Sequence, residues 1–356
     1  MSRFFSSAHS SLNAYVPGEQ PKNCEYLKLN TNESPYPPSP SVIEVFDKFD
    51  TSSLRLYPDP ECVDFTEALA EIYGLPKDRF IPANGSDEIL QFAFNAFADP
   101  DNGVAFPDIT YGLYTVCCSL YNFKQTLVPL DSDFRINPED YRFNDRMIVF
   151  ANPNAPTGIS LSLDDVEKIL KYNPDRVVLV DEAYVDFGGE SAIKLIEKYD
   201  NLLVVMTFSK SRSLAGERVA FAVASPEIIS DLEKIRYSFN PYNLSRISIA
   251  AGAASLRDRE YFSECCKKII STRAYTANEL MSLDFEVLPS SANFIFAKHA
   301  SLPGKALYEK LKERGVLVRH FSGERIKDYV RISIGTNEDM TRFISTVKAI
   351  LSEANQ

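Results

Sequence analysis

The segment RVVLVDEAY (176–184) is a short, continuously apolar run that is followed by two acidic residues and a tyrosine. Three further runs of the same kind are MIVFAN (147–152), LLVVMTFS (202–209) and VAFAVAS (219–225). Short apolar runs rich in β-branched residues are typical of strands buried on both faces of a parallel sheet. Amphipathic segments such as SLDDVEKILKY (162–172) and AIKLIEKY (192–199) predict helices between them. The alternation predicts an α/β fold with a mostly parallel central sheet flanked by helices.

The ends of the chain have a different pattern. The first 40 residues are rich in Pro, Asn and Ser and end in SPYPPSP, which favours an extended arm over helix. Residues 64–73 have helical spacing, with Asp64 as the expected cap, and a long helical stretch runs from about 245 to 282. Strand and helix patterns alternate again after that stretch. We therefore predict an N-terminal arm (1–40), a large domain (41–255) and a smaller α+β domain (256–356).

The composition excludes several classes of protein. The chain has 356 residues and a net charge of −11, and its Lys and Arg residues form no basic cluster of the kind that nucleic-acid binding requires. No apolar run reaches the roughly 18 residues of a membrane helix. The cysteines form neither a C-x-x-C motif nor a disulfide framework, so we expect reduced thiols and a cytoplasmic protein; they are Cys24, Cys62, Cys117, Cys118, Cys265 and Cys266. The three histidines are too far apart to indicate a zinc site, and no metal is predicted.

Segments with polar, charged and tyrosine side chains follow the predicted strands. ANPNAPTG (151–158), DEAY (181–184) and SKSRSLAGER (209–218) each come directly after an apolar run, and NGSDE (84–88) opens an apolar helix. In open α/β sheets, ligands bind at the carboxyl ends of the strands. We therefore expect these segments to meet at one edge of the sheet.

These segments supply what a phosphorylated pyridine aldehyde needs. Lys210 can form an imine, Asp181 can pair with the ring nitrogen, and Tyr184 can donate to the ring hydroxyl. The remaining candidates are Asn152 or Asn154 for the hydroxyl, Arg218 for the phosphate, and the backbone amides of Gly85, Ser86 and Asp87 at a helix start. Each segment alone is typical of an ordinary turn or helix start. Their joint occurrence predicts a pyridoxal-phosphate site.

The order GSDE, NPNAPTG, DEAY and TFSKSRSLAGERV resembles the pyridoxal-phosphate-dependent aminotransferase superfamily with the aspartate aminotransferase fold. More narrowly, the chain resembles the histidinol-phosphate aminotransferases over essentially its whole length. The segments that carry this narrower resemblance are NAYVPGEQP (13–21), LNTNESPYPPSP (29–40), RLYPDP (55–60), PDITYGLY (107–114), GVLVRHF (315–321) and DYVRISIGT (328–336).

The resemblance implies roles for further residues. Lys210 would hold the cofactor and then move the proton, and Tyr111 would stack on the ring. Ser209 would join Arg218 and the amides of Ser86 and Asp87 around the phosphate. Tyr57 would reach the cofactor phosphate of a neighbouring subunit, which implies a homodimer. The implied substrates are histidinol phosphate and glutamate or 2-oxoglutarate, in a pocket formed by Tyr15, Asn32, Arg319 and Arg331.

Two positions depart from the family pattern. Ala155 stands directly before Pro-Thr-Gly, where the family commonly has Asn, and Ala220 stands where Gly is usual. The contact with the ring hydroxyl would then fall to Asn154, to Asn152 or to Tyr184 alone, and Asn154 is the favoured candidate. Neither departure touches Lys210 or Asp181.

Other functions remain open at the level of the sequence. The sequence pattern is also similar to that of threonine-phosphate decarboxylases and of aromatic or other amino-acid aminotransferases. A cofactor-responsive regulatory module is disfavoured, because the chain has no additional segment of a size to bind DNA. A nicotinamide site is disfavoured as well, since no G-x-G-x-x-G follows a predicted strand.

Overall fold

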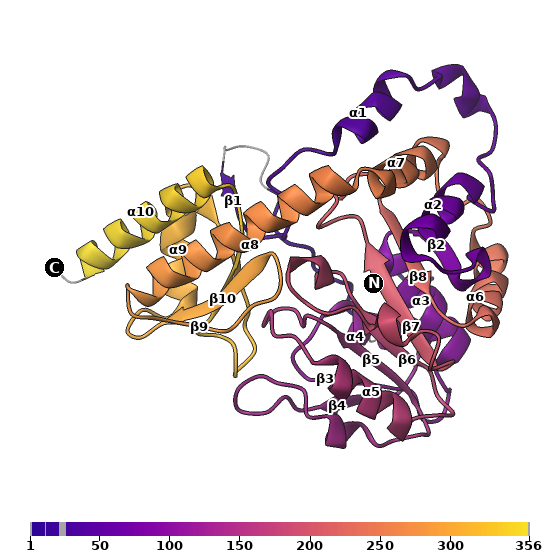
Figure 1. Cartoon of the computed structure of the whole chain (residues 1–356). Helices are drawn as coiled ribbons and strands as arrows, with labels where there is room; N and C mark the ends of the chain where they lie inside the picture. The colour runs from indigo at the N-terminus through magenta and orange to yellow at the C-terminus, as the bar shows by residue number, and fades with distance from the viewer. Residues whose placement is uncertain (1, 11, 21–25, 355–356) are drawn as a thin grey trace.

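The computed structural model describes residues 2–10, 12–20 and 26–354, and Figure 1 shows its arrangement. Within these residues a seven-stranded sheet lies at the centre of the larger part of the molecule. Its strands are, in spatial order, β2 (Phe80–Asn84), β8 (Val219–Val223), β7 (Leu202–Thr207), β6 (Val178–Asp181), β5 (Met147–Ala151), β3 (Val104–Pro107) and β4 (Gln125–Val128). This confirms the predicted α/β fold with a mostly parallel central sheet.

One predicted strand runs against the others. The segment 219–225 was grouped with the parallel strands, but β8 pairs antiparallel with both β7 and β2. The physical reason is the short connection, because β7 ends at Thr207 and β8 begins at Val219. A parallel crossover needs a dozen or more residues and usually a helix, whereas a short loop can return the chain antiparallel.

Helices cover both faces of the sheet, and the strand residues alternate between two apolar cores. Val178 and Val180 of β6 pack on one side with residues of α2, α5 and α7, whereas Leu179 packs on the other side with residues of α3, α4 and α6. The bounds of these helices are α2 (Val63–Tyr73), α3 (Ser86–Phe97), α4 (Leu113–Tyr121), α5 (Leu163–Tyr172), α6 (Pro226–Phe239) and α7 (Arg246–Arg257). Burial on both faces is what the continuous apolar runs predicted.

A second sheet forms the smaller part, at the left of Figure 1. Its order is β12 (Arg319–His320), β13 (Val330–Ser333), β10 (Phe294–His299) and β9 (Phe285–Val287). It packs with α8 (Arg259–Met281), α9 (Gly304–Glu313) and α10 (Asn337–Ala354) around one apolar core. The N-terminal segment joins this part, since β1 (Leu27–Lys28) pairs with β11 (Val316–Leu317) before the chain reaches α1 (Pro40–Asp47). The division at residues 40 and 255 stays a prediction.

The long helical stretch predicted at 245–282 is confirmed, and a break at Asp258 divides it into α7, which ends at Arg257, and α8, which begins at Arg259. Two other local predictions were wrong. The segment 192–199 forms only a short 3₁₀ turn, Ala192–Leu195, in place of a full helix. Asp64 lies inside the first turn of α2, and it is the Asp59 carboxylate that accepts from the Val63 amide at 2.8 Å. Helix boundaries depend on such side-chain bonds more than on apolar spacing.

Among the helices of the described residues, none combines the length and the apolar composition needed to cross a membrane.

Candidate active site

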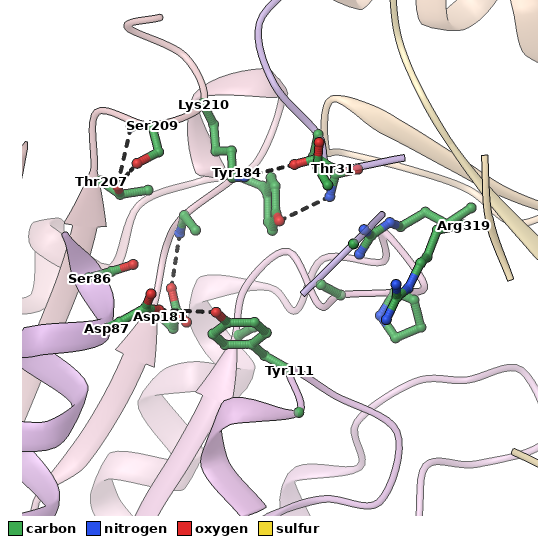
Figure 2. A pocket seen from close by; sticks show the side chains of 18 of the residues that line it. Thr31, Ser86, Asp87, Tyr111, Asp181, Tyr184, Thr207, Ser209, Lys210 and Arg319 are labelled. Carbon is green, nitrogen blue, oxygen red and sulfur yellow. Dashed lines mark hydrogen bonds between the residues drawn. The ribbon is translucent and has the colours of Figure 1, made fainter. Parts of the chain in front are cut away.

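A cavity of about 360 Å³ opens at the carboxyl ends of β5, β6 and β7, between the two parts of the molecule. Figure 2 shows Ser86 and Ser209 at one end of it and Arg319 at the other. Twelve of the residues predicted for the site line this cavity, and they are Tyr15, Asn32, Ser86, Asp87, Tyr111, Asp181, Tyr184, Ser209, Lys210, Arg218, Arg319 and Arg331. The expectation that the strand-end segments meet at one sheet edge is therefore confirmed.

The first end of the cavity is a cradle for an anion. Ser86 begins α3, so its turn presents backbone N–H groups that have no partner within the helix. Arg218 donates to the Ser209 hydroxyl at 3.3 Å and also pairs with the Asp87 carboxylate at 3.3 Å. Gly85 has φ +82° and packs directly on this guanidinium, because a Cβ there would lie 2.2 Å from Arg218 Nη2. Only glycine permits this close approach.

Asp181 ends β6 on the cavity floor and is buried. Its carboxylate accepts from the Tyr114 hydroxyl at 2.9 Å and from the Ala183 amide at 3.2 Å. Burial raises the pKa of this carboxyl to about 6, although the Tyr114 hydrogen bond acts in the opposite direction. A buried carboxylate of this kind is stabilised in its charged form by a cation, so the site suits a protonated ring nitrogen.

Lys210 lies in the turn after β7, and its side chain enters the cavity. Its Nζ donates to the Thr31 carbonyl at 3.1 Å and lies 5.9 Å from the centre of the Tyr184 ring. Figure 2 shows Lys210, Tyr184 and Thr31 on the same side of the cavity. The amine therefore projects between the anion cradle and the second end of the cavity, where a carbonyl carbon can reach it.

Two arginines and a tyrosine form the second end. Arg331, on β13, donates to the Asn30 carbonyl at 3.1 Å, and its Nε has no hydrogen-bond partner within the described chain. Burial lowers the pKa of this guanidinium. Burial raises the pKa of the Tyr15 hydroxyl, and the charges of Arg331 and Arg319 oppose this effect. Arg331 and Arg319 both line the cavity, and guanidinium groups at a cavity wall suit an anionic group.

Three predicted residues lie elsewhere. Gly85 contributes close packing next to the cavity, and Tyr57 is 74% exposed and stacks on Tyr242 with ring centres 4.5 Å apart. Asn154 has no free amide group, because it donates to the Ile109 carbonyl and the Thr157 hydroxyl and accepts from Thr110.

Asn152 is occupied in the same way, since both ends of its amide bond the Leu161 backbone. Ala155 lines the cavity at this point. The structure therefore gives no support to the favoured role of Asn154, and Tyr184 is left as the candidate donor to a ring hydroxyl.

Sequence reasoning missed Tyr114, Thr207 and Thr31. Tyr114 was one of two tyrosines in PDITYGLY, and its nearness to Tyr111 was the available signal. Tyr111 precedes α4 and Tyr114 lies in its first turn, where the two rings pack edge to face with centres 5.8 Å apart. The Thr207 hydroxyl bonds the Ser209 hydroxyl at 3.0 Å inside the cradle. Thr31 acts through its backbone carbonyl, so its side-chain type carried no signal.

Comparisons with known proteins give matches that cover nearly the whole chain. The family model for aminotransferase class I and II matches residues 25–347. A histidinol-phosphate aminotransferase of Clostridium botulinum (strain 657 / Type Ba4) is 48% identical over 353 residues, which cover 99% of this chain and 100% of the relative. The enzyme of that name from Brachyspira hyodysenteriae is 47% identical and covers 99% of each chain.

Solved structures share the fold. The crystal structure of histidinol-phosphate aminotransferase from Sinorhizobium meliloti in complex with pyridoxal-5'-phosphate superposes with a TM-score of 0.88 at 23% identity, covering 98% of this chain and 99% of that one. At such identity the likeness concerns the arrangement of the chain alone.

Proposed function

We propose that this chain, which belongs to the class I and II aminotransferase family, transfers the amino group of histidinol phosphate to 2-oxoglutarate with pyridoxal phosphate as cofactor. The observation that carries the substrate assignment is the two-ended cavity. Its anion cradle at Ser86 suits the cofactor phosphate, which leaves the Arg331 guanidinium free for an anionic group of the substrate.

The residues present fit the cofactor. Gly85 brings the Arg218 guanidinium and the start of α3 together, and this cluster suits a phosphate. Pyridoxal phosphate, when bound, supplies an aldehyde for the amino group and a ring that delocalises the electron pair left after proton removal. Asp181 would hold its charge next to the ring nitrogen, and Tyr184 would donate to the ring oxygen. Lys210 Nζ would take the proton from the carbon that bears the substrate amine.

The two substrates share the second end of the cavity. Histidinol phosphate and 2-oxoglutarate differ in shape, but both present an anionic group at the end distant from the reacting carbon. The Arg331 guanidinium binds that group from the cavity wall, and Arg319 and Tyr15 close the same end. A fork of guanidinium donors accepts phosphate and carboxylate in similar geometry, so one site serves both.

We also propose a homodimer in which Tyr57 reaches the neighbouring active site. The support is the stacked pair of Tyr57 and Tyr242, at 74% and 43% exposure, next to the exposed side chains of Leu54 at 62% and Leu56 at 50%. Exposed apolar patches of this kind mark protein interfaces. A cytoplasmic location is proposed on the described cysteines, which are free and buried, while Cys24 lies outside the described residues.

An absorbance scan of the enzyme loaded with pyridoxal phosphate tests the proposal. Histidinol phosphate, added without a keto acid, should convert the visible cofactor band to that of the aminated cofactor, and 2-oxoglutarate should restore it. The Lys210→Ala variant serves as the control and should not convert. A wild-type band that does not respond to histidinol phosphate would refute the substrate assignment. Release of carbon dioxide from threonine phosphate would instead favour the decarboxylase alternative.

A further inference from the structure

The Tyr184 hydroxyl lies at the end of a chain of hydrogen bonds that begins at Ser333, the last residue of β13. Asn32 Nδ2 donates to the Tyr184 hydroxyl at 3.0 Å. The Ser333 hydroxyl donates to Asn32 Oδ1 at 2.9 Å and accepts from the Asn32 backbone N–H at 2.8 Å. Asn32 and Ser333 are buried, and the Asn32 carbonyl accepts from Asn293 at 2.9 Å. Asn32 is therefore held at its backbone and at its side chain.

The network fixes the direction of the protons. The Ser333 oxygen accepts from a backbone N–H, which cannot reverse its role, so the Ser333 proton is free to go to Asn32 Oδ1. The opposite orientation of the Asn32 amide would leave the Ser333 proton without an acceptor in a buried site. The amide nitrogen therefore faces Tyr184.

Consequently Tyr184 is an acceptor toward Asn32 and a donor toward the cavity. Within the described chain, Asn32 is the single hydrogen-bond partner of the Tyr184 hydroxyl. Its proton therefore has no acceptor on the protein side, and Tyr184 lines the cavity next to Lys210, as Figure 2 shows. An anionic oxygen that enters the cavity beside Tyr184 meets a hydroxyl with its proton already aimed at it.

Ala155 increases the dependence on this hydroxyl. The Ala155 methyl group occupies the cavity wall and offers no hydrogen bond, while the neighbouring amides of Asn152 and Asn154 are engaged away from the cavity. The ring oxygen of the cofactor then relies on Tyr184 for a side-chain donor from this side.

We propose that Asn32 and Ser333 are positioning residues that hold the Tyr184 hydroxyl as a hydrogen-bond donor to the ring oxygen of the cofactor. The inference rests on the proposed contact between Tyr184 and that oxygen. It gives Asn32 a role through Tyr184 in place of a direct one toward the substrate. Asn32 has φ +57°, a conformation that asparagine tolerates better than most residues, so the residue type suits both the backbone and the network.

The test is a pH titration of the visible absorbance band of the cofactor-loaded enzyme. A donor to the ring oxygen stabilises the charge that this oxygen gains when the bound cofactor loses its proton, so loss of the donor raises the apparent pKa of the band. We expect Tyr184→Phe to raise it by roughly one unit, the shift that corresponds to one hydrogen bond to a charged group. Ser333→Ala and Asn32→Gly should each raise it by a part of that shift.

The decisive measurement repeats both substitutions in the Tyr184→Phe background, where they should cause no further shift. The matched control is Thr276→Val, which removes a buried hydroxyl that bonds only the Thr272 carbonyl within α8, and it should leave the titration unchanged. Glycine is chosen at position 32 because it adopts the same backbone conformation. If Asn32→Gly does not fold, Ser333→Ala carries the test alone.

The outcomes distinguish the contact between Tyr184 and the ring oxygen from the positioning role of Asn32 and Ser333. If Tyr184→Phe leaves the band titration unchanged, the proposed contact of Tyr184 fails and the inference fails with it. If Tyr184→Phe shifts the titration but Ser333→Ala and Asn32→Gly do not, the contact stands and the positioning role is wrong. Equal shifts in the wild-type and Tyr184→Phe backgrounds also overturn the positioning role, because they show an effect that does not pass through Tyr184.

Discussion

Replacing Arg331 with methionine should weaken the binding of both substrates and leave the folding stability of the protein nearly unchanged. Arg331 packs between Phe294 and Phe321, with its guanidinium carbon 5.3 Å and 5.6 Å from the ring centres. Its single hydrogen bond within the described chain goes to the Asn30 carbonyl, and its Nε is unsatisfied. Methionine retains the apolar stem between the two rings and removes the charge.

The two effects differ in size. Loss of a hydrogen-bonded pair between the guanidinium and an anionic group costs about 2–4 kcal/mol of substrate binding, which is roughly 30- to 1000-fold in KM. For folding, loss of the Asn30 hydrogen bond costs about 1–2 kcal/mol, and removal of a buried donor without a partner returns a similar amount. The net change in the free energy of unfolding is therefore within about 1 kcal/mol.

Arg273→Met is the matched control. Arg273 is also a guanidinium whose pKa burial lowers, but it donates to the Phe187 carbonyl at 2.8 Å and the Ala292 carbonyl at 2.6 Å. Its loss leaves two carbonyl groups without donors, which should cost about 2–5 kcal/mol of stability and leave KM unchanged. Steady-state kinetics with both substrates and urea unfolding of the unliganded protein measure the contrast. Unchanged KM values for Arg331→Met, with a loss of stability like that of Arg273→Met, would refute the substrate role.

Three further predictions concern other parts of the molecule. Burial raises the pKa of Asp181 to about 6, and the charged carboxylate is the form that stabilises a ring cation. As the pH is lowered past about 6, the cofactor affinity measured in equilibrium titrations should therefore decrease more steeply for the wild type than for Asp181→Asn. Burial raises the pKa of Glu182 from 4.5 to about 8, so between these pH values the folded state keeps a proton that the unfolded chain releases. The free energy of unfolding should therefore decrease as the pH rises from 4.5 to 8. Thermal unfolding of Glu182→Gln should show a smaller decrease over the same pH range. An equal mixture of Tyr57→Ala and Lys210→Ala subunits should regain about one quarter of wild-type activity, because about half of the dimers are mixed and each mixed dimer holds one intact site out of two. No regain on mixing would contradict shared sites.

Some of the active site could be predicted from the sequence because strand ends are local features. The run before Asp181 is apolar and β-branched, and the carboxylate that ends it falls at the edge where a parallel sheet binds ligands. The same reasoning located Lys210 after β7, and both residues line the cavity. The direction of β8 could have been predicted as well, since the segment between Thr207 and Val219 is too short for a crossover helix.

The hydrogen bonds of individual side chains could not be predicted, because their partners are distant along the chain. Asn154 was favoured as a cofactor contact because asparagine is a suitable donor, but its amide is used by Ile109, Thr110 and Thr157. Nothing in its own neighbourhood of the sequence indicates that the Ile109 carbonyl lies within reach.

The same limit applies with more consequence to Asn32, whose orientation depends on Ser333, 301 positions further along the chain. A residue type shows which hydrogen bonds a side chain can make, and the fold decides which of them remain available to a ligand. The hydrogen bonds of the Asn154 amide to other protein groups leave it none for a ligand. The hydrogen bond from Asn32, in contrast, directs the Tyr184 proton toward the cavity. A substitution at Ser333, outside the cavity lining, therefore tests whether the sheet that contains β13 influences the chemistry at Tyr184.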